Sequence, residues 1–279
     1  MKGLLRRVVT AVFFVVIMLG GLYGGRYSFV ALFALITGLC LWEFLGLTLR
    51  RSQGQRDRVR RVIGLILGLM PFVLISLFKL EVIHSPEDFL IYALLLFFPL
   101  LFLSFIYELF TASEQPFANI AFLLLGVVYI GIPFAMLDFI AFRGDEFRAN
   151  TVFGLLLLTW SNDTAAYLVG SRIGKTPLFP RISPKKTWEG SLGGVVITFL
   201  IAFLISQWFR EHSTQQWLVL AGIVAIFGST GDLVESMLKR SENIKDSGNL
   251  LPGHGGVLDR FDAFIFLLPF ATAYLLLIK

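Results

Sequence analysis

Charged residues are scarce in this sequence. Asp, Glu, Lys and Arg together make up 15% of its 279 residues, whereas soluble domains carry about 25%. Hydrophobic residues make up 56%. A soluble protein of this length would need more polar side chains on its surface than 19 acids and 24 bases can supply. A soluble enzyme and a disordered protein are therefore excluded as leading interpretations.

Cysteine and histidine are also scarce. Cys40 is the single cysteine, so a disulfide scaffold is excluded, and its apolar surroundings predict a small packed or lipid-facing side chain. The sequence has only three histidines, and none pairs with Cys40 in a pattern typical of zinc. Any metal site in this protein is therefore expected to use oxygen ligands.

Long apolar runs recur along the whole chain instead. Each run has the roughly 20 residues that a helix needs to cross the hydrocarbon of a bilayer, and backbone groups in lipid must be satisfied within the segment. The fold class that we predict is all-α, a polytopic integral membrane protein with about nine transmembrane helices. The predicted spans are 8–23, 27–47, 62–78, 89–110, 117–142, 151–170, 191–209, 217–238 and 257–278.

The first span resembles a signal peptide, because Lys2, Arg6 and Arg7 precede an apolar stretch. No small-residue cleavage site follows it, and eight further spans do. We therefore interpret it as a first transmembrane helix.

The distribution of Lys and Arg predicts the orientation. With a cytoplasmic N-terminus and nine alternating helices, 18 of the 24 basic residues fall on the cytoplasmic side, as the positive-inside rule requires. The basic run at residues 50–61 is most simply an anchor against anionic lipid head groups, and we expect no nucleic-acid partner.

The two halves of the chain differ in character. The spans within residues 1–150 are mostly Leu, Phe, Val and Ile, and we expect them to form a scaffold that can supply dimer contacts. Glu43 and Asp138 are exceptions, either as end-of-helix or packing residues or as auxiliary polar contacts. Polar residues crowd into residues 151–279, where we expect the catalytic region.

A first polar cluster lies inside the sixth span, at residues 160–164. Consecutive polar residues in an apolar helix are costly in lipid. Trp160, Asp163, Thr164 and Tyr167 recur at helical spacing and share one face. That face is expected to line a protein cavity, although a buried polar contact between helices is the alternative.

A second cluster follows in the loop after this span. Gly170, Gly174 and Lys175 imitate a phosphate-binding P-loop, but the glycine spacing is wrong and no strand precedes it, so this interpretation is rejected. Residues 183–190 are more informative, because Lys185 and Lys186 lie between hydroxyl residues and a tryptophan. Lysines suit phosphate oxygens. The alternative is a positive-inside anchor with an interfacial tryptophan.

The third cluster is the strongest and covers residues 231–262. Asp232, Glu235, Ser236 and Lys239 share one face of the eighth predicted helix, and a glycine-rich loop connects it to the ninth, which opens with Asp259 and Asp262. Carboxylates with basic residues beside them fit a divalent ion that holds a phosphate-bearing substrate, and Mg²⁺ prefers such ligands.

At these residues the sequence resembles the phosphatidate cytidylyltransferase (CDP-diacylglycerol synthase) family. The family signature is S-x-[apolar]-K-R-x4-K-D-x-[GSA]-x2-[apolar]-[PG]-x-H-G-G-[apolar]-x-D-R-[apolar]-D, and residues 236–262 match every defined position. Residues 183–190 and the segment around Asp163 also look like that family. The resemblance therefore covers roughly residues 160–262.

The resemblance implies a bacterial inner-membrane nucleotidyltransferase that joins CTP to phosphatidate, with Mg²⁺ and a monovalent cation such as K⁺. It further implies a homodimer whose active site faces the cytoplasm. The implied catalytic residues are Asp232, Asp259, Asp262 and Asp163, of which Asp232 and Asp259 would bind the metal. The implied substrate-binding residues are Ser183, Lys185, Lys186, Thr187, Lys239, Arg240, Lys245, Asp246, His254 and Arg260.

Three other functions share some of these features. A transporter would also place acids in the membrane, but no inverted repeat is visible. A CDP-alcohol phosphotransferase would space its acids D-x3-D after a D-G…A-R element, whereas Asp259 and Asp262 are spaced D-x2-D. The same reaction on another lipid phosphate stays open, because lipid tails are recognised by nonspecific apolar packing.

Overall fold

The computed structural model describes residues 2–49, 55–111, 113–144, 146–248, 250 and 255–278. The chain divides into two compact units. The first contains Met1–Asp138 and Asp246–Leu258, and the second contains Phe139–Lys245 and Asp259–Lys279. Residues 246–258 therefore belong to the first unit, although the helix that begins at Leu258 lies in the second unit from Asp259 onward.

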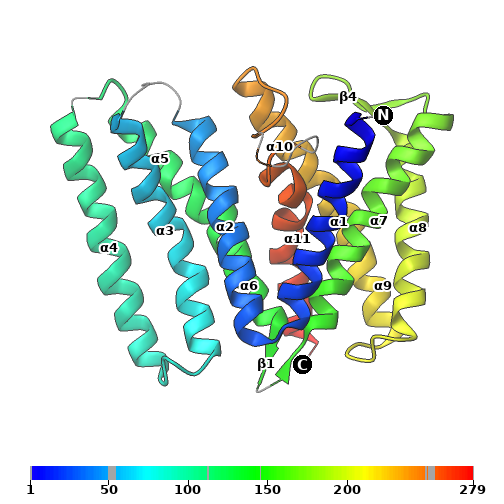
Figure 1. Ribbon diagram of the computed structural model, residues 1–279, viewed down its shortest axis with the longest axis horizontal. Coiled ribbons are helices and arrows are strands. Elements are labelled where there is room, and N and C mark those ends of the chain that lie inside the picture. The colour runs from blue at the N-terminus through cyan, green and yellow to red at the C-terminus, as the bar shows by residue number, and fades with distance from the viewer. Residues whose placement is uncertain are drawn as a thin grey trace. The chain divides into compact units, whose positions relative to one another are not determined.

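Helices dominate the first unit. In Figure 1 helices α2, α3 and α4 lie side by side, and each packs on its neighbour in the sequence. The elements are α1 (Lys2–Tyr23), α2 (Arg26–Thr48), α3 (Gln55–Lys79), α4 (Pro86–Thr111), α5 (Pro116–Gly126), the π-helical turn η1 (Val127–Gly131) and α6 (Ile132–Ala141), whose end passes into the second unit.

The second unit combines long helices with two short antiparallel hairpins. Helices α7 and α8 make the most extensive helix pair, which Figure 1 shows side by side. The elements are β1 (Phe142–Arg143), β2 (Glu146–Phe147), α7 (Ala149–Ile173), β3 (Pro177–Phe179), β4 (Ser183–Thr187), α8 (Trp188–Ser206), α9 (Thr214–Ile223), the π-helical turn η2 (Val224–Gly228), α10 (Ser229–Ser241) and α11 (Leu258–Leu277).

The helices confirm the predicted all-α membrane protein. Among the residues that the structure describes, eight segments are long and apolar enough to cross a bilayer, and each coincides with a predicted span to within a few residues at either end. Two of these spans are continuous across a π-helical turn, 116–141 across η1 and 214–241 across η2. In α1 the apolar stretch Val9–Tyr23 is shorter than a full span.

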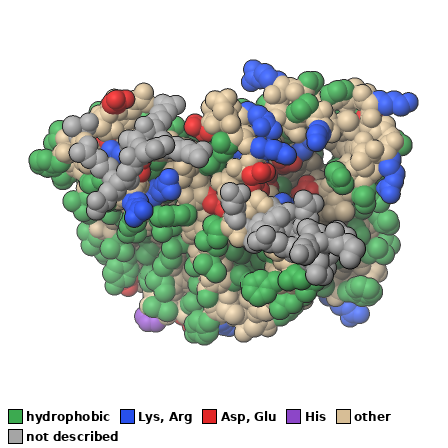
Figure 2. All heavy atoms as spheres, turned by 45° about the horizontal axis from the view of Figure 1, so that its top comes forward, with side chains coloured by type: hydrophobic (Ala, Val, Ile, Leu, Met, Phe, Trp, Pro, Cys, Tyr) green, Lys and Arg blue, Asp and Glu red, His purple; other side chains and the backbone are tan. Residues whose placement is uncertain are grey.

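The surface of the helices suits lipid. Only 6% of the residues in the apolar stretch of α4 are buried, whereas 56% are buried in that of α2. A soluble protein rarely exposes so large an apolar surface. On the face drawn in Figure 2, hydrophobic side chains cover much of the lower part of the view, while acidic and basic side chains gather above them.

A buried ion-pair network corrects part of one prediction. Arg60 was expected to anchor the chain against lipid head groups, yet its side chain is 2% exposed. Its guanidinium pairs with Asp57 at 3.0 Å and donates to both carboxylate oxygens of Glu108. Arg60 therefore joins α3 to α4 inside the first unit. Arg50 and Arg51 of the same basic run lie outside the described residues.

Asp138, one of the two exceptional acids in the first half, is a packing residue of α6. It is fully buried and accepts a hydrogen bond from Ser76 Oγ at 2.7 Å.

Candidate active site

The polar face predicted on α7 lines a cavity at two of its four positions, Asp163 and Tyr167, whereas Trp160 and Thr164 do not belong to the lining. Asp163 and Tyr167 line a cavity of about 490 Å³ in the second unit. Asn162 is 2% exposed, its side-chain Nδ2 donates to Ser229 Oγ at 3.2 Å, and its side-chain Oδ1 accepts from Thr198 Oγ1 at 3.3 Å. These bonds tie α7 to α8 and α10 on one wall of the cavity.

The hairpin β3–β4 carries the two predicted lysines. Pro177 pairs with Thr187 across the hairpin, and Thr187 then caps α8 by accepting from Gly190 N at 3.2 Å. Glu189 accepts hydrogen bonds from the backbone N–H groups of Lys175 and Thr176. The hairpin is therefore fastened at its base to the first turn of α8.

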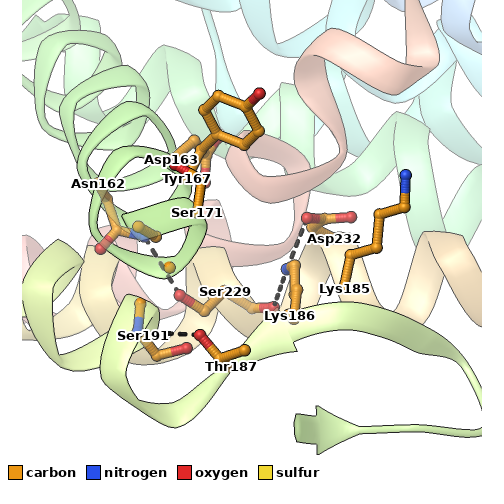
Figure 3. Close-up of a pocket in the computed structure, with 13 residues that line it drawn as sticks. Asn162, Asp163, Tyr167, Ser171, Lys185, Lys186, Thr187, Ser191, Ser229 and Asp232 are labelled. Atoms are coloured by element: carbon orange, nitrogen blue, oxygen red, sulfur yellow. Dashed lines mark hydrogen bonds and ion pairs between the residues drawn. The ribbon is translucent and has the colours of Figure 1, made fainter. Parts of the chain in front are cut away.

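Helix α10 also contributes to the lining of the cavity. It begins directly after the π-helical turn η2, a feature that is frequent at functional sites, and its Ser229 and Asp232 are one turn apart and both line the cavity. Lys186 Nζ lies 2.5 Å from Asp232 Oδ2 and 3.4 Å from the carbonyl oxygen of Ser229. Figure 3 shows the Lys186 side chain pointing to these two residues.

A group of carboxylates adjoins the cavity. One oxygen from each of Asp232, Glu235 and Asp262 lies within 4.8 Å of the others. Gly231 permits this approach of α10 to α11, because a Cβ at this position would lie 2.6 Å from Phe266 Cβ and 2.8 Å from the carbonyl oxygen of Asp262.

Lys239 joins the carboxylates of two helices. Its ammonium pairs with Glu235 one turn earlier and with Asp259 Oδ1 at 2.7 Å. Ser236 Oγ donates to Asp232 Oδ1 at 3.3 Å. The predicted shared faces of the last two spans are thereby confirmed, and they face each other.

The donor set fits a hard divalent cation. Glu235 is fully buried, Asp262 is 7% exposed, and Oε1 of Glu235 has no hydrogen-bond partner among the described residues. Two oxygens on opposite sides of one Mg²⁺ lie roughly 4.2 Å apart, and the three carboxylate oxygens lie no more than 4.8 Å from one another. A buried oxygen without a donor and an excess of carboxylates over paired lysines both favour a cation.

The structure brings most of the predicted site residues together. Asp163, Lys185, Lys186, Thr187 and Asp232 line the cavity. Beside it, Asp262 belongs to the carboxylate group and Asp259 accepts from Lys239, so Asp259 stays a predicted metal ligand. Arg260 lies within electrostatic range of Asp163.

The remaining predicted residues have other positions. Ser183 begins β4 outside the cavity lining, and Arg240 donates to the backbone carbonyls of Ile182 and Ile244. Lys245 and Asp246 are exposed beyond the end of α10. His254 lies outside the described residues.

Sequence reasoning missed several cavity residues. Ser229 lies three residues before Asp232, so the helical spacing already pointed to it. The hydroxyls of Ser171 and Ser191 also line the cavity, but nothing in the sequence distinguishes them from other serines. Glu235 was placed on the correct face without a role.

Comparison with known proteins identifies the family of the chain. Residues 5–278 match the model of the cytidylyltransferase family. The chain is 36% identical over 275 residues to the phosphatidate cytidylyltransferase of Bacillus subtilis, covering 97% of both chains. It is 41% identical over 172 residues to the enzyme of the same name from Staphylococcus haemolyticus, covering 61% of this chain and 64% of that one. A similar match of 40% over 172 residues is found with Staphylococcus aureus. The chain therefore belongs to the cytidylyltransferase family, and it is a membrane enzyme of the nucleotidyltransferase class.

Proposed function

We propose that this protein transfers the cytidylyl group of CTP to phosphatidate and so forms CDP-diacylglycerol and pyrophosphate. The observation that carries the proposal is the cavity lined by Lys185, Lys186 and Asp232, in which Lys186 pairs with Asp232 and further carboxylates of α10 and α11 lie beside it. The names of the relatives and the signature at residues 236–262 support this choice of substrates.

The reaction needs little general-base help. A phosphate oxygen of phosphatidate forms a bond to the α-phosphorus of CTP, while the bond from that phosphorus to the bridging oxygen breaks. Pyrophosphate leaves with the electron pair. The attacking phosphate is already ionised at neutral pH, so the barrier lies in repulsion between anions and in charge on the leaving group. Lys185 and Lys186 attract phosphate oxygens and thus oppose both effects.

The proposal includes Mg²⁺ as the cofactor. Asp232, Glu235 and Asp262 would hold it, and Asp259 would support the site through Lys239 or as a further ligand. When bound, such an ion neutralises phosphate charge and orients the triphosphate. Lys239 also keeps Glu235 and Asp259 in place by pairing with both, so it organises the carboxylates from within α10.

We further propose that the cavity opens to the cytoplasm of a bacterial cell and that the protein acts as a homodimer. The excess of basic residues on one side supports the orientation, and the family resemblance supports the dimer. Cysteines placed at exposed Ser241 and Glu87 test the orientation, since Cys40 is buried. A membrane-impermeant thiol reagent outside the cell should label the Glu87→Cys variant alone. Cross-linking in membranes tests the dimer.

The activity is tested with purified protein in mixed micelles. Labelled CTP, Mg²⁺ and phosphatidate should give a labelled liponucleotide and one pyrophosphate for each molecule formed. Omitting phosphatidate should abolish pyrophosphate release. A protein that instead consumes CDP-diacylglycerol in the presence of an alcohol, and makes no liponucleotide from CTP, would contradict the proposal.

A further inference from the structure

Glu43 of α2 is a buried acid, and its carboxylate accepts hydrogen bonds from donors in a distant part of the chain. Its side chain belongs to the first unit, as do residues 246–258, and the residue is 6% exposed. Ser247 Oγ donates to its Oε2 at 3.0 Å, Val257 N donates to its Oε1 at 3.0 Å, and Leu258 N donates to its Oε2 at 2.9 Å. The two ends of the segment before α11 therefore meet at one carboxylate.

Two glycines of the segment make room for this carboxylate. A Cβ on Gly248 would lie 2.5 Å from Glu43 Oε1, and a Cβ on Gly256 would collide with Glu43 Oε2 and with Ser247 Oγ. Real Cβ atoms do not approach other heavy atoms so closely, so any larger residue would displace Glu43. The glycine-rich composition of this segment thus has a specific packing reason at these two positions.

The bonds to Val257 and Leu258 place Glu43 at the N-terminus of α11, which begins at Leu258. The first N–H groups of a helix have no partner within the helix, and the helix dipole places positive charge there. A carboxylate satisfies both needs. Glu43 therefore acts as an N-terminal cap for α11, supplied by a helix more than 200 positions earlier in the sequence.

The residue directly after Leu258 is Asp259, and Asp262 follows in the same turn of α11. We infer that Glu43 is a positioning residue of the enzyme: by fixing the first turn of α11 it sets where Asp259 and Asp262 stand. This inference rests on the proposed function. Glu43 is not itself a metal ligand, because its two oxygens already accept three hydrogen bonds from the protein.

Glu43→Gln tests the inference, since it keeps the shape but replaces one acceptor oxygen by an NH₂ group that faces the backbone donors. A misplacement of catalytic groups by about 1 Å can cost ~100-fold in rate. We expect kcat per folded molecule to fall between about 10-fold and 100-fold, while the KM for CTP changes little because the lysines of β4 are untouched. A role in folding alone would lower the yield and leave kcat unchanged.

Asp138→Asn is the matched control. It is the same change of a buried carboxylate in the same unit, but Asp138 accepts from Ser76 and makes none of the bonds to residues 247–258. Its kcat per folded molecule should equal that of the wild-type protein. Hydrogen exchange of a peptide covering 255–262 gives a readout without activity. Exchange should be faster in Glu43→Gln than in both the wild type and the control.

Ser247→Ala removes a single contact and is the milder variant if Glu43→Gln does not fold. Both backbone donors to Glu43 remain in place, so kcat per folded molecule should fall by less than in Glu43→Gln. In Glu43→Gln, adding Ser247→Ala should cause almost no further loss, because both changes break the same cluster. Fully additive losses would overturn the inference.

Two further results would also overturn it. One is unchanged exchange at the start of α11 in Glu43→Gln. The other is faster exchange with an unchanged kcat per folded molecule. A wild-type protein that makes no liponucleotide would instead refute the proposed function, and the exchange experiment would still decide whether Glu43 holds the start of α11.

Discussion

Glu235→Gln separates the effect of the carboxylate group on folding from its effect on metal binding. Asp232, Glu235 and Asp262 lie together with Asp259 nearby, and the lysines paired with them in the structure are Lys186 and Lys239. Without a cation the group carries more negative than positive charge. Removing the charge of fully buried Glu235 relieves its repulsion with the other carboxylates, and Lys239 keeps its ion pair with Asp259. The variant should therefore be at least as stable as the wild type when Mg²⁺ is absent.

When Mg²⁺ is present, the wild type should become more stable than Glu235→Gln. A ligand at ten times its Kd stabilises the folded protein by about 1.4 kcal/mol, which for a chain of this size raises Tm by roughly 2–3 °C. If the loss of Glu235 weakens binding tenfold, the same Mg²⁺ concentration contributes only about 0.4 kcal/mol, and the rise in Tm falls to roughly 1 °C.

The assay is thermal unfolding of detergent-solubilised protein across a Mg²⁺ titration, without substrate. Glu211→Gln is the control, because Glu211 accepts from Thr151 N at 2.8 Å and does not belong to the carboxylate group. Its Mg²⁺ response should match the wild type. An equal rise in Tm for Glu235→Gln and the wild type would refute the assignment of Glu235 as a metal ligand.

Further predictions concern three other positions. Lys186→Gln should raise the KM for CTP and lower kcat. The loss of about 2 kcal/mol of charge-assisted bonding corresponds to a fall of about 30-fold in kcat/KM. Lys185 is exposed, so Lys185→Gln should affect mainly KM, and steady-state kinetics distinguish the two variants. Gly231→Ala should separate α10 from α11 and reduce Mg²⁺-dependent activity at least tenfold, while an unchanged rate would show that the helices need not approach so closely. Burial lowers the pKa of His212 to about 4, with repulsion from Arg148 adding to the effect. Protonation therefore favours the unfolded chain, so the stability that neutral His212 contributes is complete above about pH 6.5 and is lost toward pH 4. His212→Gln should flatten this part of the Tm–pH curve, and an unchanged curve would contradict the argument.

Hydrophobicity and helical spacing were sufficient to predict the spans. Lipid imposes one requirement on every segment, satisfied backbone bonds within an apolar run, so local composition decides the result. The same spacing placed Asp232, Glu235 and Lys239 on one face. The structure agrees because these relations span only two turns of a helix.

Contacts between helices could not be predicted in the same way. Arg60 was interpreted as a surface anchor because its neighbours are basic. In the structure it is buried and forms an ion pair with Glu108 of α4. The pairing of Lys186 with Asp232 likewise depends on a hairpin that has no strong strand pattern in the sequence. Such partners are set by how helices pack, and residue type alone does not reveal the packing.

Glu43 shows why residue type leaves the role of a buried acid open. In a predicted span, an isolated carboxylate is costly unless it finds donors or a cation. The sequence left its partners open, and in the structure Glu43 is satisfied by backbone N–H groups and one hydroxyl. Backbone donors carry no sequence signature beyond the glycines that admit the carboxylate. Gly248 and Gly256 appear in the sequence only as parts of a loop. Because they leave room for its carboxylate, Glu43 of α2 can cap α11.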